Sequence, residues 1–425
     1  MMAQAAPADV AGTSSDASSG PFVAWARQHA APLDSLRVGS VRLVALGEPT
    51  HGAHEPLAVR NDLIKYLVTR HGFTAVALET GFSEARVINE FVHGGPGEVA
   101  QVVSSSLTWG FGRYAENLEL VQWLRQYNAA PGRQHKISFY GIDLSGGRNA
   151  DFNNSRIALD RALEYLAAVA PQDGQRLQSR LEPYLDKFTT VGYGALPAAQ
   201  RDDLQRAVAD LLTTLERLPA TVIASRSDHE WAVRNAVVAR DLEQMFRVSP
   251  PPSPASEDGL DAGFYQAAMV RDRAMADNVQ WALRHEGSRG RVLVFAHNAH
   301  VMAAPLRGGI WSVYPRAPLT MGHFLRNRLG AQLLIVGQSA ALNGKGLPSV
   351  AGSTVLDTAL DRVGQKHFLL DLRAARDTPA VAAWLRQPQS MRANLTTEIV
   401  IPPSEAFDAL VFTRLLTPAG SSIAH

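Results

Sequence analysis

The chain has 425 residues, of which 46% are hydrophobic and 19% are charged, and its 41 basic residues nearly balance its 40 acidic ones. This composition is typical of a globular protein with a large core, and the charge balance gives no reason to expect nucleic acid or an anionic membrane surface as a partner. The lack of cysteine excludes disulfides, thiolate metal sites and a cysteine nucleophile. No apolar run approaches the roughly 18 residues of a membrane-spanning helix.

The beginning of the chain is small and polar, with neither the basic start nor the apolar centre of a signal peptide. Such a composition does not bury enough apolar surface to fold, so we expect a disordered tail over residues 1–20. A chain without cysteine folds in either redox environment, so the cysteine count does not indicate the compartment. Without an export signal in the sequence, we expect a cytoplasmic protein.

Six short apolar runs are predicted to be strands, and they are continuous rather than alternating in polarity. Strands with both faces buried have this pattern, which is typical of parallel sheets covered by helices. Between the first two runs, residues 55–72 carry a helical stripe of Leu, Ile and Val and end in Gly72, a residue suited to a helix C-cap. This order of strand, helix and strand indicates a parallel sheet. The six runs are residues 41–46, 73–79, 136–142, 291–296, 331–337 and 407–412.

The middle of the chain contains several helical stretches and no convincing strand. A loop rich in Pro, Ser and Gly at residues 248–263 separates the last two of them. The sequence therefore predicts an α/β fold with a mostly parallel central sheet flanked by helices. Residues 21–150 and 264–425 would form the catalytic core, and residues 151–263 a helical insertion that serves as a lid or second lobe. The predicted helices are residues 155–170, 203–218, 228–246 and 264–285.

Acidic and imidazole side chains follow four of the predicted strands. The carboxyl edge of an open parallel sheet is where such folds bind ligands, so these side chains can meet in one pocket. Each one alone has a structural explanation, because an acid after a strand often caps the next helix and a single histidine is more often structural. Helix capping does not call for histidine at two strand ends, so the set favours a functional site. Its members are Glu48, His51 and His54 after the first strand, Glu79 after the second, Asp143 after the third, and His297 and His300 after the fourth.

This set of residues suits the activation of water. A histidine that titrates near neutral pH can take a proton from water, and a carboxylate beside it fixes its tautomer and raises its basicity. A second histidine or an arginine can stabilise a developing oxyanion. Arg60, in the first predicted helix, is close enough in sequence to face the same site.

Motifs of several other enzyme classes are absent. The sequence has no G-x-S-x-G elbow, P-loop, Rossmann glycine pattern or H-E-x-x-H motif. We expect no cofactor. A divalent metal remains an alternative, because both histidine pairs have metal-compatible spacing and Glu79 or Asp143 could complete the ligand set.

The chain resembles the erythromycin esterase family in eight stretches that run from near residue 37 to near residue 415. Each stretch alone is weak, and the combination is specific. In the segment 151–260, the helical pattern resembles that of the family more than the amino-acid sequence does. The stretches are LGEPTHGAHE (46–55), the helix with Arg60, ALETGF (77–82), YGIDL (140–144), RDRAMADN (271–278), AHNAH (296–300), MGHFL (321–325) and SEAFDALVF (404–412).

The resemblance implies a hydrolase that opens the lactone ester of a macrolide without a covalent intermediate, an activity linked to antibiotic resistance. On that analogy, His51 is the general base that activates water. Glu48 and Glu79 would orient this base, with Arg60 nearby as a further catalytic residue. His54 has no counterpart in the mechanism and is expected to be structural.

The resemblance also implies roles for residues in the second half of the chain. His300, rather than His297, would bind the ester carbonyl or assist the leaving alkoxide. Arg271 and Asp272 match a family motif, although a buried ion pair that ties the insertion to the core explains them equally well. The expected substrate-binding residues are His297, Asp143, Asn298, Arg271 and Met321.

The resemblance leaves the substrate open. The family includes members tied to polysaccharide gene clusters, and the pocket wall is expected to come from the insertion, which is the least matched part. The expected partner is a small molecule, either a macrolide or another bulky ester, with no nucleic acid and no membrane. Oligomeric state does not follow from the sequence. A haem- or metal-binding protein on the same fold is the alternative from a different class.

Overall fold

The fold was analysed in a computed structural model of the chain. The structure describes residues 19–132, 135–148, 151–249, 262–345, 347, 354–392 and 398–421. Residues 1–18 of the predicted tail and most of the predicted loop at residues 248–263 therefore lie outside the described residues. The last two residues of the predicted tail are ordered, because Ser19 is buried and Gly20 begins helix α1 (Gly20–His29). In the part of the chain that the structure describes, no helix is long and apolar enough to cross a membrane.

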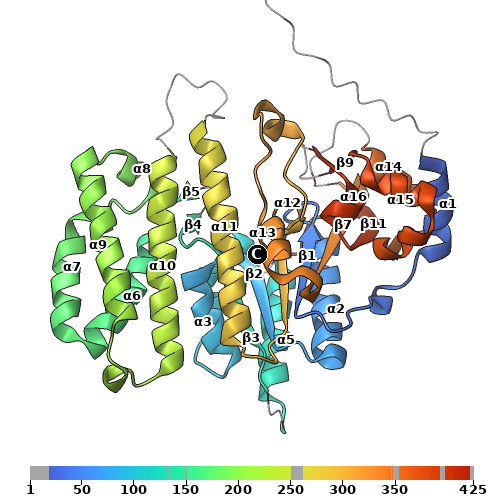
Figure 1. Ribbon diagram of the computed structural model, residues 1–425. Coiled ribbons are helices and arrows are strands. Elements are labelled where there is room, and N and C mark those ends of the chain that lie inside the picture. Colours follow the sequence, from blue (N-terminus) through green and yellow to red (C-terminus); the bar gives the residue numbers. More distant parts are fainter. Residues whose placement is uncertain are drawn as a thin grey trace, which may run out of the picture.

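The core of the protein is a seven-stranded sheet in the order β3-β2-β6-β1-β7-β11-β8 (Figure 1). All neighbouring strands in this sheet are parallel except β8, which runs antiparallel to β11. The six predicted strands are present, each beginning one or two residues later than predicted, and the predicted fold class is confirmed. The strands are β1 (Leu43–Glu48), β2 (Ala75–Gly81), β3 (Ser138–Asp143), β6 (Val292–His297), β7 (Leu333–Asn343), β8 (His367–Asp371) and β11 (Ala409–Leu416).

The central strands β1, β2 and β6 are buried along their whole length, as their continuous apolar sequences require. Alternate residues of β1 enter apolar cores on opposite faces of the sheet: Leu43 and Ala45 on one face, Val44 and Leu46 on the other. Parallel pairing brings the carboxyl ends of these strands to one edge, where Glu48 lies opposite His297. Segments that are far apart in sequence thus deliver side chains to neighbouring positions.

Helices cover both faces of the sheet. The helix predicted between the first two strands is α2, and Gly72 ends it with the left-handed φ of 65° expected of a glycine C-cap. Helix α11 packs against β3 on the opposite face and forms part of the other apolar core. The helices of the core are α1 (Gly20–His29), α2 (His54–His71), α3 (Phe82–Val92), α4 (Val99–Ser106), α5 (Ala115–Ala129), α11 (Ala262–His285), α12 (Asn298–Val301), α13 (Met321–Leu329), α14 (Val355–Asp361), α15 (Pro379–Arg386) and α16 (Pro403–Ala406).

Among the described residues between β3 and α11, five helices lie together at one side of the sheet, as the green helices in Figure 1 show. Helix α10 packs against α11, and one apolar core runs without interruption from the sheet into these helices. The division into a core and an insertion stays a prediction. The five are α6 (Arg156–Val169), α7 (Pro171–Leu185), α8 (Thr190–Gly194), α9 (Ala198–Glu216) and α10 (Arg226–Val248). Two short hairpins that the sequence did not suggest are β4 (Gly147–Arg148) with β5 (Asp151–Phe152), and β9 (Gln389–Arg392) with β10 (Glu398–Ile401).

Candidate active site

A buried carboxylate and a histidine form a close pair at the end of β1. Nδ1 of His51 lies 2.6 Å from Oε1 of Glu48, and the His51 side chain is 32% exposed, on the wall of a cavity. Burial opposes a charge on the imidazole, but the charge and hydrogen bond of Glu48, together with the charge of Glu79, outweigh it and raise the pKa of His51 to about 9. The turn is tight at Gly52, where φ is 75° and a Cβ would lie 2.8 Å from the Tyr114 hydroxyl.

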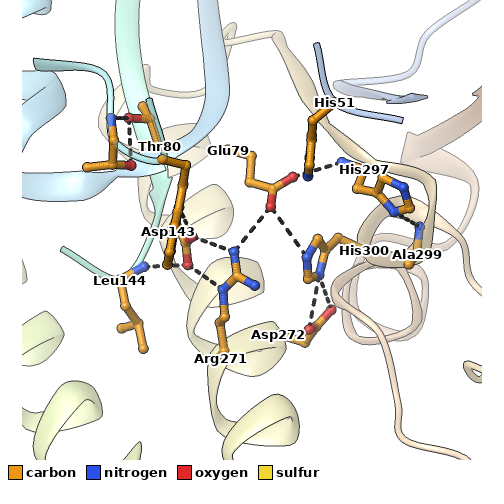
Figure 2. Close-up of polar contacts among 12 residues, drawn as sticks. His51, Glu79, Thr80, Asp143, Leu144, Arg271, Asp272, His297, Ala299 and His300 are labelled. Atoms are coloured by element: carbon orange, nitrogen blue, oxygen red, sulfur yellow. Dashed lines mark hydrogen bonds and ion pairs between the residues drawn. The ribbon is translucent and has the colours of Figure 1, made fainter. Parts of the chain in front are cut away.

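Glu79, near the end of β2, is the carboxylate around which three other site residues gather (Figure 2). Its Oε2 accepts the backbone N–H of His297 at 2.8 Å. Its Oε1 accepts a hydrogen bond from Arg271 at 3.1 Å and lies 3.4 Å from Nε2 of His300. Burial favours the neutral acid, but the charges of His300, His51 and Arg271 hold the pKa of Glu79 at about 2. Glu79 is therefore a fixed negative charge at the floor of the cavity.

A second histidine–carboxylate pair joins α12 to α11. Nδ1 of His300 lies 3.0 and 3.1 Å from the two oxygens of Asp272, and Oδ1 of Asp272 also accepts the backbone N–H of Met321 at 2.7 Å. Burial opposes the charge on His300, but Asp272 and then Glu79 raise its pKa above the ordinary value. The sequence did not assign Asp272 to the site; its position next to Arg271 in the RDRAMADN stretch was the available signal.

His297, the last residue of β6, differs from the other two histidines because it is neutral. Its Nδ1 accepts the backbone N–H of Ala299 at 3.2 Å, so the ring proton belongs on Nε2. Burial and then the charge of His51 lower the pKa of His297 to about 3. Nε2 is buried, and no described residue forms a hydrogen bond of good geometry with it. The Pro49 carbonyl lies near the ring and slightly favours its protonated form. The His297 and His51 rings are 5.2 Å apart and line the same cavity.

Arg271 joins α11 to the sheet edge. Its Nε and Nη2 donate to the two oxygens of Asp143 at 2.9 and 2.6 Å, and the side chain also lines the cavity. Burial opposes its charge, but Asp143 and Glu79 raise its pKa further above the ordinary value. Asp143 is fully buried and accepts a further hydrogen bond from Trp109 Nε1 at 2.9 Å. Asp143 therefore holds Arg271 in place and does not line the cavity, contrary to its expected contact with substrate.

Arg60 also lies away from the cavity, contrary to expectation. Its buried guanidinium donates to Asn117 Oδ1 at 2.6 Å and to Asn61 Oδ1 at 3.0 Å. Burial lowers the pKa of Arg60 to about 10, so it stays charged and acts on Glu48 from behind. A void of about 20 Å³ between Arg60 and Glu48 has room for about one water molecule. Arg60 can support the Glu48–His51 pair electrostatically but does not reach a substrate in the cavity.

Asn298 and Met321 serve the framework as well. The amide of Asn298 is fully buried and forms two hydrogen bonds with the backbone of Gln338 on β7, at 2.7 and 3.2 Å. Met321 is fully buried at the first position of α13. Neither side chain lines the cavity, because Asn298 is hydrogen-bonded to β7 and Met321 belongs to the apolar core.

A cavity of about 650 Å³ opens above the charged residues. His51, Glu79, Arg271, His297 and His300 line its polar part, and the rest of its wall is mostly apolar and aromatic. The insertion supplies part of this wall, as expected, but other parts come from residues 107–114 and 303–320. Neither of these connections was expected to line the pocket, although LTWGFGRY (107–114) places three aromatic residues and two glycines between helices. The wall includes Trp109, Phe111, Tyr114, Phe152, Met245, Phe246, Phe264, Leu306, Trp311, Pro318 and Leu319.

Trp109 has the most unusual backbone of the site. Its φ of 60° lies in the left-handed region, which costs a non-glycine residue about 1–2 kcal/mol, and no other described non-glycine residue has a positive φ. The guanidinium of Arg271 lies 5.2 Å from the centre of its ring, and a Cβ at Gly147 would meet the indole at 2.5 Å. Strain of this kind persists where the surroundings hold a residue firmly, as at functional sites.

The described side chains offer no obvious metal site. Within residues 19–421, leaving out the ranges not described, no group of three His, Asp or Glu residues has the geometry to hold an ion. The Nδ1 atoms of His51 and His300 face carboxylates, and that of His297 accepts a backbone N–H. Independence from a metal or cofactor stays an expectation.

A parallel sheet that gathers histidines and carboxylates at its carboxyl edge, below a deep cavity, is an architecture suited to hydrolysis. A family model described as erythromycin esterase matches residues 68–415. The chain therefore belongs to the erythromycin esterase family, and the protein is an ester hydrolase.

Individual relatives are distant in sequence but similar along most of their length. Erythromycin esterase type II from Escherichia coli is 27% identical over 311 residues, which cover 71% of this chain and 69% of that protein. The crystal structure of a succinoglycan biosynthesis protein superimposes with a TM-score of 0.75 at 21% identity, over 96% of this chain and 99% of that one. A variant of the erythromycin esterase EreC in its open conformation superimposes with a TM-score of 0.66 at 20% identity, over 90% of this chain and 93% of that one. At these identities, the two structures show a shared fold.

Proposed function

We propose that the protein opens the lactone ester of a macrolide, or of a similarly bulky ester, with water activated by His51 and without a covalent intermediate. The observation that carries this proposal is a pair of histidine–carboxylate contacts, Glu48–His51 and Asp272–His300, that face one cavity with Glu79 beside them. In each pair the carboxylate contacts Nδ1, which orients the ring and leaves Nε2 for the reaction.

His51 is the general base in this mechanism. In its uncharged form, Nε2 takes a proton from a water molecule whose oxygen attacks the carbonyl carbon of the ester. Glu48 accepts the Nδ1–H hydrogen bond and stabilises the imidazolium that forms. Burial raises the pKa of Glu48 above its ordinary value, while the charge and hydrogen bond of His51, and the charge of Arg60 behind Glu48, favour the ionised form of that carboxylate.

The other two histidines act on the two oxygens of the ester. The His297 ring is neutral and lines the cavity, so we assign its Nε2–H, and not His300, to the negative charge that develops on the carbonyl oxygen, which requires Nε2 to turn from the Pro49 carbonyl toward the substrate. His300, whose proton is stabilised by Asp272 and Glu79, donates that proton to the alkoxide as the acyl carbon–oxygen bond breaks. One water is consumed, and a carboxylate and an alcohol are formed.

The cavity supports a bulky and largely apolar substrate. Its volume of about 650 Å³ lies in the range of about 300–1,000 Å³ typical of small-molecule sites. Charged side chains line part of the cavity, and aromatic and other apolar side chains form most of the remainder. Because relatives are named erythromycin esterase, a macrolide is the first substrate to test. Because a succinoglycan biosynthesis protein has the same fold, other bulky esters should be tested as well.

Incubation with erythromycin tests the proposal. Mass spectrometry should detect a product heavier by one water, and His51→Ala should abolish its formation without a change in the circular dichroism spectrum. Hydrolysis of other lactones but not of erythromycin would reject the macrolide and retain the hydrolase. Wild-type rates in His51→Ala would reject the mechanism.

A further inference from the structure

The segment after the last strand of the sheet crosses the turn that carries His51. We call residues 417–421 the C-terminal strap. The N–H of Ala419 donates to the carbonyl of Gly52 at 2.9 Å, and the N–H of His54 donates to the carbonyl of Thr417 at 2.8 Å. The strap is therefore hydrogen-bonded to the chain one and three residues after His51.

The same strap is bound on its other side to the start of α5. The N–H of Ala115 donates to the carbonyl of Gly420 at 2.9 Å, and the N–H of Gly420 donates to Oε1 of Glu116 at 3.0 Å. Tyr114, which forms a β-bridge with the strap, lines the cavity. The strap thus joins the His51 turn to an aromatic part of the cavity wall.

Glu116 is the residue on which these connections converge. It is 3% exposed, and its Oε1 lies 2.6 Å from Nδ1 of His54 while it also accepts the strap N–H. Its backbone carbonyl accepts hydrogen bonds from Arg60 at 3.3 Å and Asn61 at 2.9 Å. A single buried residue therefore contacts the first residue of α2, the strap and the arginine behind Glu48.

We infer that Glu116 is a positioning residue for His51, acting through His54 and the C-terminal strap. A general base is effective only when its nitrogen is held close to the water that it deprotonates, and a displacement of about 1 Å from a distant change can cost about 100-fold in rate. The turn with His51 is held on its far side by groups that Glu116 binds directly. This inference rests on the proposed function of His51 as the base.

Substitution of Glu116 provides the first test. Glu116→Ala removes both side-chain contacts and should lower kcat by about 10- to 100-fold while KM changes by less than about twofold. Glu116→Gln keeps an oxygen that can accept from His54 and from Gly420, so it should recover most of the lost kcat. Glu119→Ala is the matched control, because it removes an exposed carboxylate from the next turn of α5 and should leave kcat unchanged.

A second readout does not depend on esterase activity. The folded protein is treated with diethyl pyrocarbonate, and the modification of His51 is followed by peptide mass spectrometry. His51 should be modified at least about threefold faster in Glu116→Ala than in the wild type or in Glu119→Ala, because a loosened turn exposes the ring more often. Thr417→Val removes a 2.7 Å hydrogen bond from the strap to Glu55. This variant should also lower kcat and speed the modification of His51, and it replaces Glu116→Ala in both tests if Glu116→Ala does not fold.

The outcomes separate this inference from the proposed function. Equal kcat and equal modification of His51 in Glu116→Ala and Glu119→Ala would overturn the positioning role. Faster modification in Glu116→Ala, in a protein that hydrolyses no ester, would reject the proposed function and support the positioning role.

Discussion

Three histidines at one cavity hold different charges because their immediate partners differ. His51 and His300 each face a carboxylate, which outweighs burial and raises the pKa, whereas burial and the charge of His51 lower the pKa of His297 to about 3. The charge states therefore separate His297, the proposed oxyanion donor, from His51 and His300, the proposed base and proton donor. Residues of one type can thus perform different roles when their surroundings separate their pKa values.

The raised pKa of His51 predicts that activity and stability change in opposite directions with pH. The base must be uncharged and His300 must hold the proton that it donates, so kcat/KM should rise by up to about tenfold per pH unit toward the His51 pKa of about 9 and fall once His300 is deprotonated. The same raised pKa stabilises the fold fully below the ordinary value of 6.5, and this contribution is lost as the pH rises through about 9. Rates and thermal unfolding measured over this range test both trends. A kcat/KM profile that levels near pH 6.5 would contradict the prediction.

Substitution of the other two histidines should separate their roles. His297→Asn should lower kcat by about 100- to 1,000-fold for every ester, because the oxyanion loses a donor. His300→Asn should slow alkyl esters strongly and aryl esters little, because an aryloxide leaves without a proton. Parallel assays with alkyl and aryl esters of the same acid distinguish these patterns. If His297→Asn spares aryl esters and His300→Asn does not, the two roles are exchanged.

Among the elements, α11 connects the helical region to the sheet edge through two consecutive residues. Arg271 binds Asp143 at the end of β3, and Asp272 binds His300 in α12. Consecutive helical residues point in directions about 100° apart, which lets one turn of helix serve both contacts. The contribution of α11 to the site is therefore both structural and electrostatic.

The ion pair between α11 and β3 predicts a measurable loss of stability. Asp143→Ala should lower the free energy of unfolding by about 3 kcal/mol, because it leaves a largely buried guanidinium with one fewer carboxylate. The double variant Asp143→Ala/Arg271→Met should regain much of this loss, since no unpaired charge remains. Urea unfolding measures both values. Exposed ion pairs contribute up to about 1 kcal/mol. If Asp143→Ala lowers the free energy of unfolding by less than this, solvent screens the pair.

Much of the sheet could be predicted, because buried parallel strands are continuous apolar runs. Strand β8 was missed because it is a short edge strand of five residues, with polar residues at both ends. Glu79 and the three cavity-lining histidines could also be predicted, since each lies at or shortly after the end of a central strand. Asp272 also lines the cavity but comes from α11, so strand-end position did not indicate it. The residues expected at the cavity but found behind it are Arg60, Asp143, Asn298 and Met321. Their placement depends on side-chain partners from distant segments, which strand-end position does not encode.

On the scale of the whole molecule, the proposed chemistry uses only side chains of this chain and water. We expect prolonged dialysis against EDTA to leave kcat unchanged, and elemental analysis of the active protein to find well under one divalent ion per chain. Loss of activity that one divalent ion restores would support a metal-dependent hydrolase instead. A strong visible absorption band in the purified protein would support the haem-binding alternative.

The residues proposed to react and the residues that surround the substrate belong to different parts of the chain. Glu48 and His297 are paired in the ladder between β1 and β6, and Glu79 lies in β2 just after Leu78, the last residue paired with β6. Much of the wall, by contrast, comes from α10 and from the connections at residues 107–114 and 303–320. Exchange of the connection at residues 303–320 would therefore change which ester fits without moving the atoms that activate water, whereas residues 107–114 also contact the His51 and Arg271 side chains. Evolution can diversify substrates on this scaffold by replacing connections, and protein engineers can do the same.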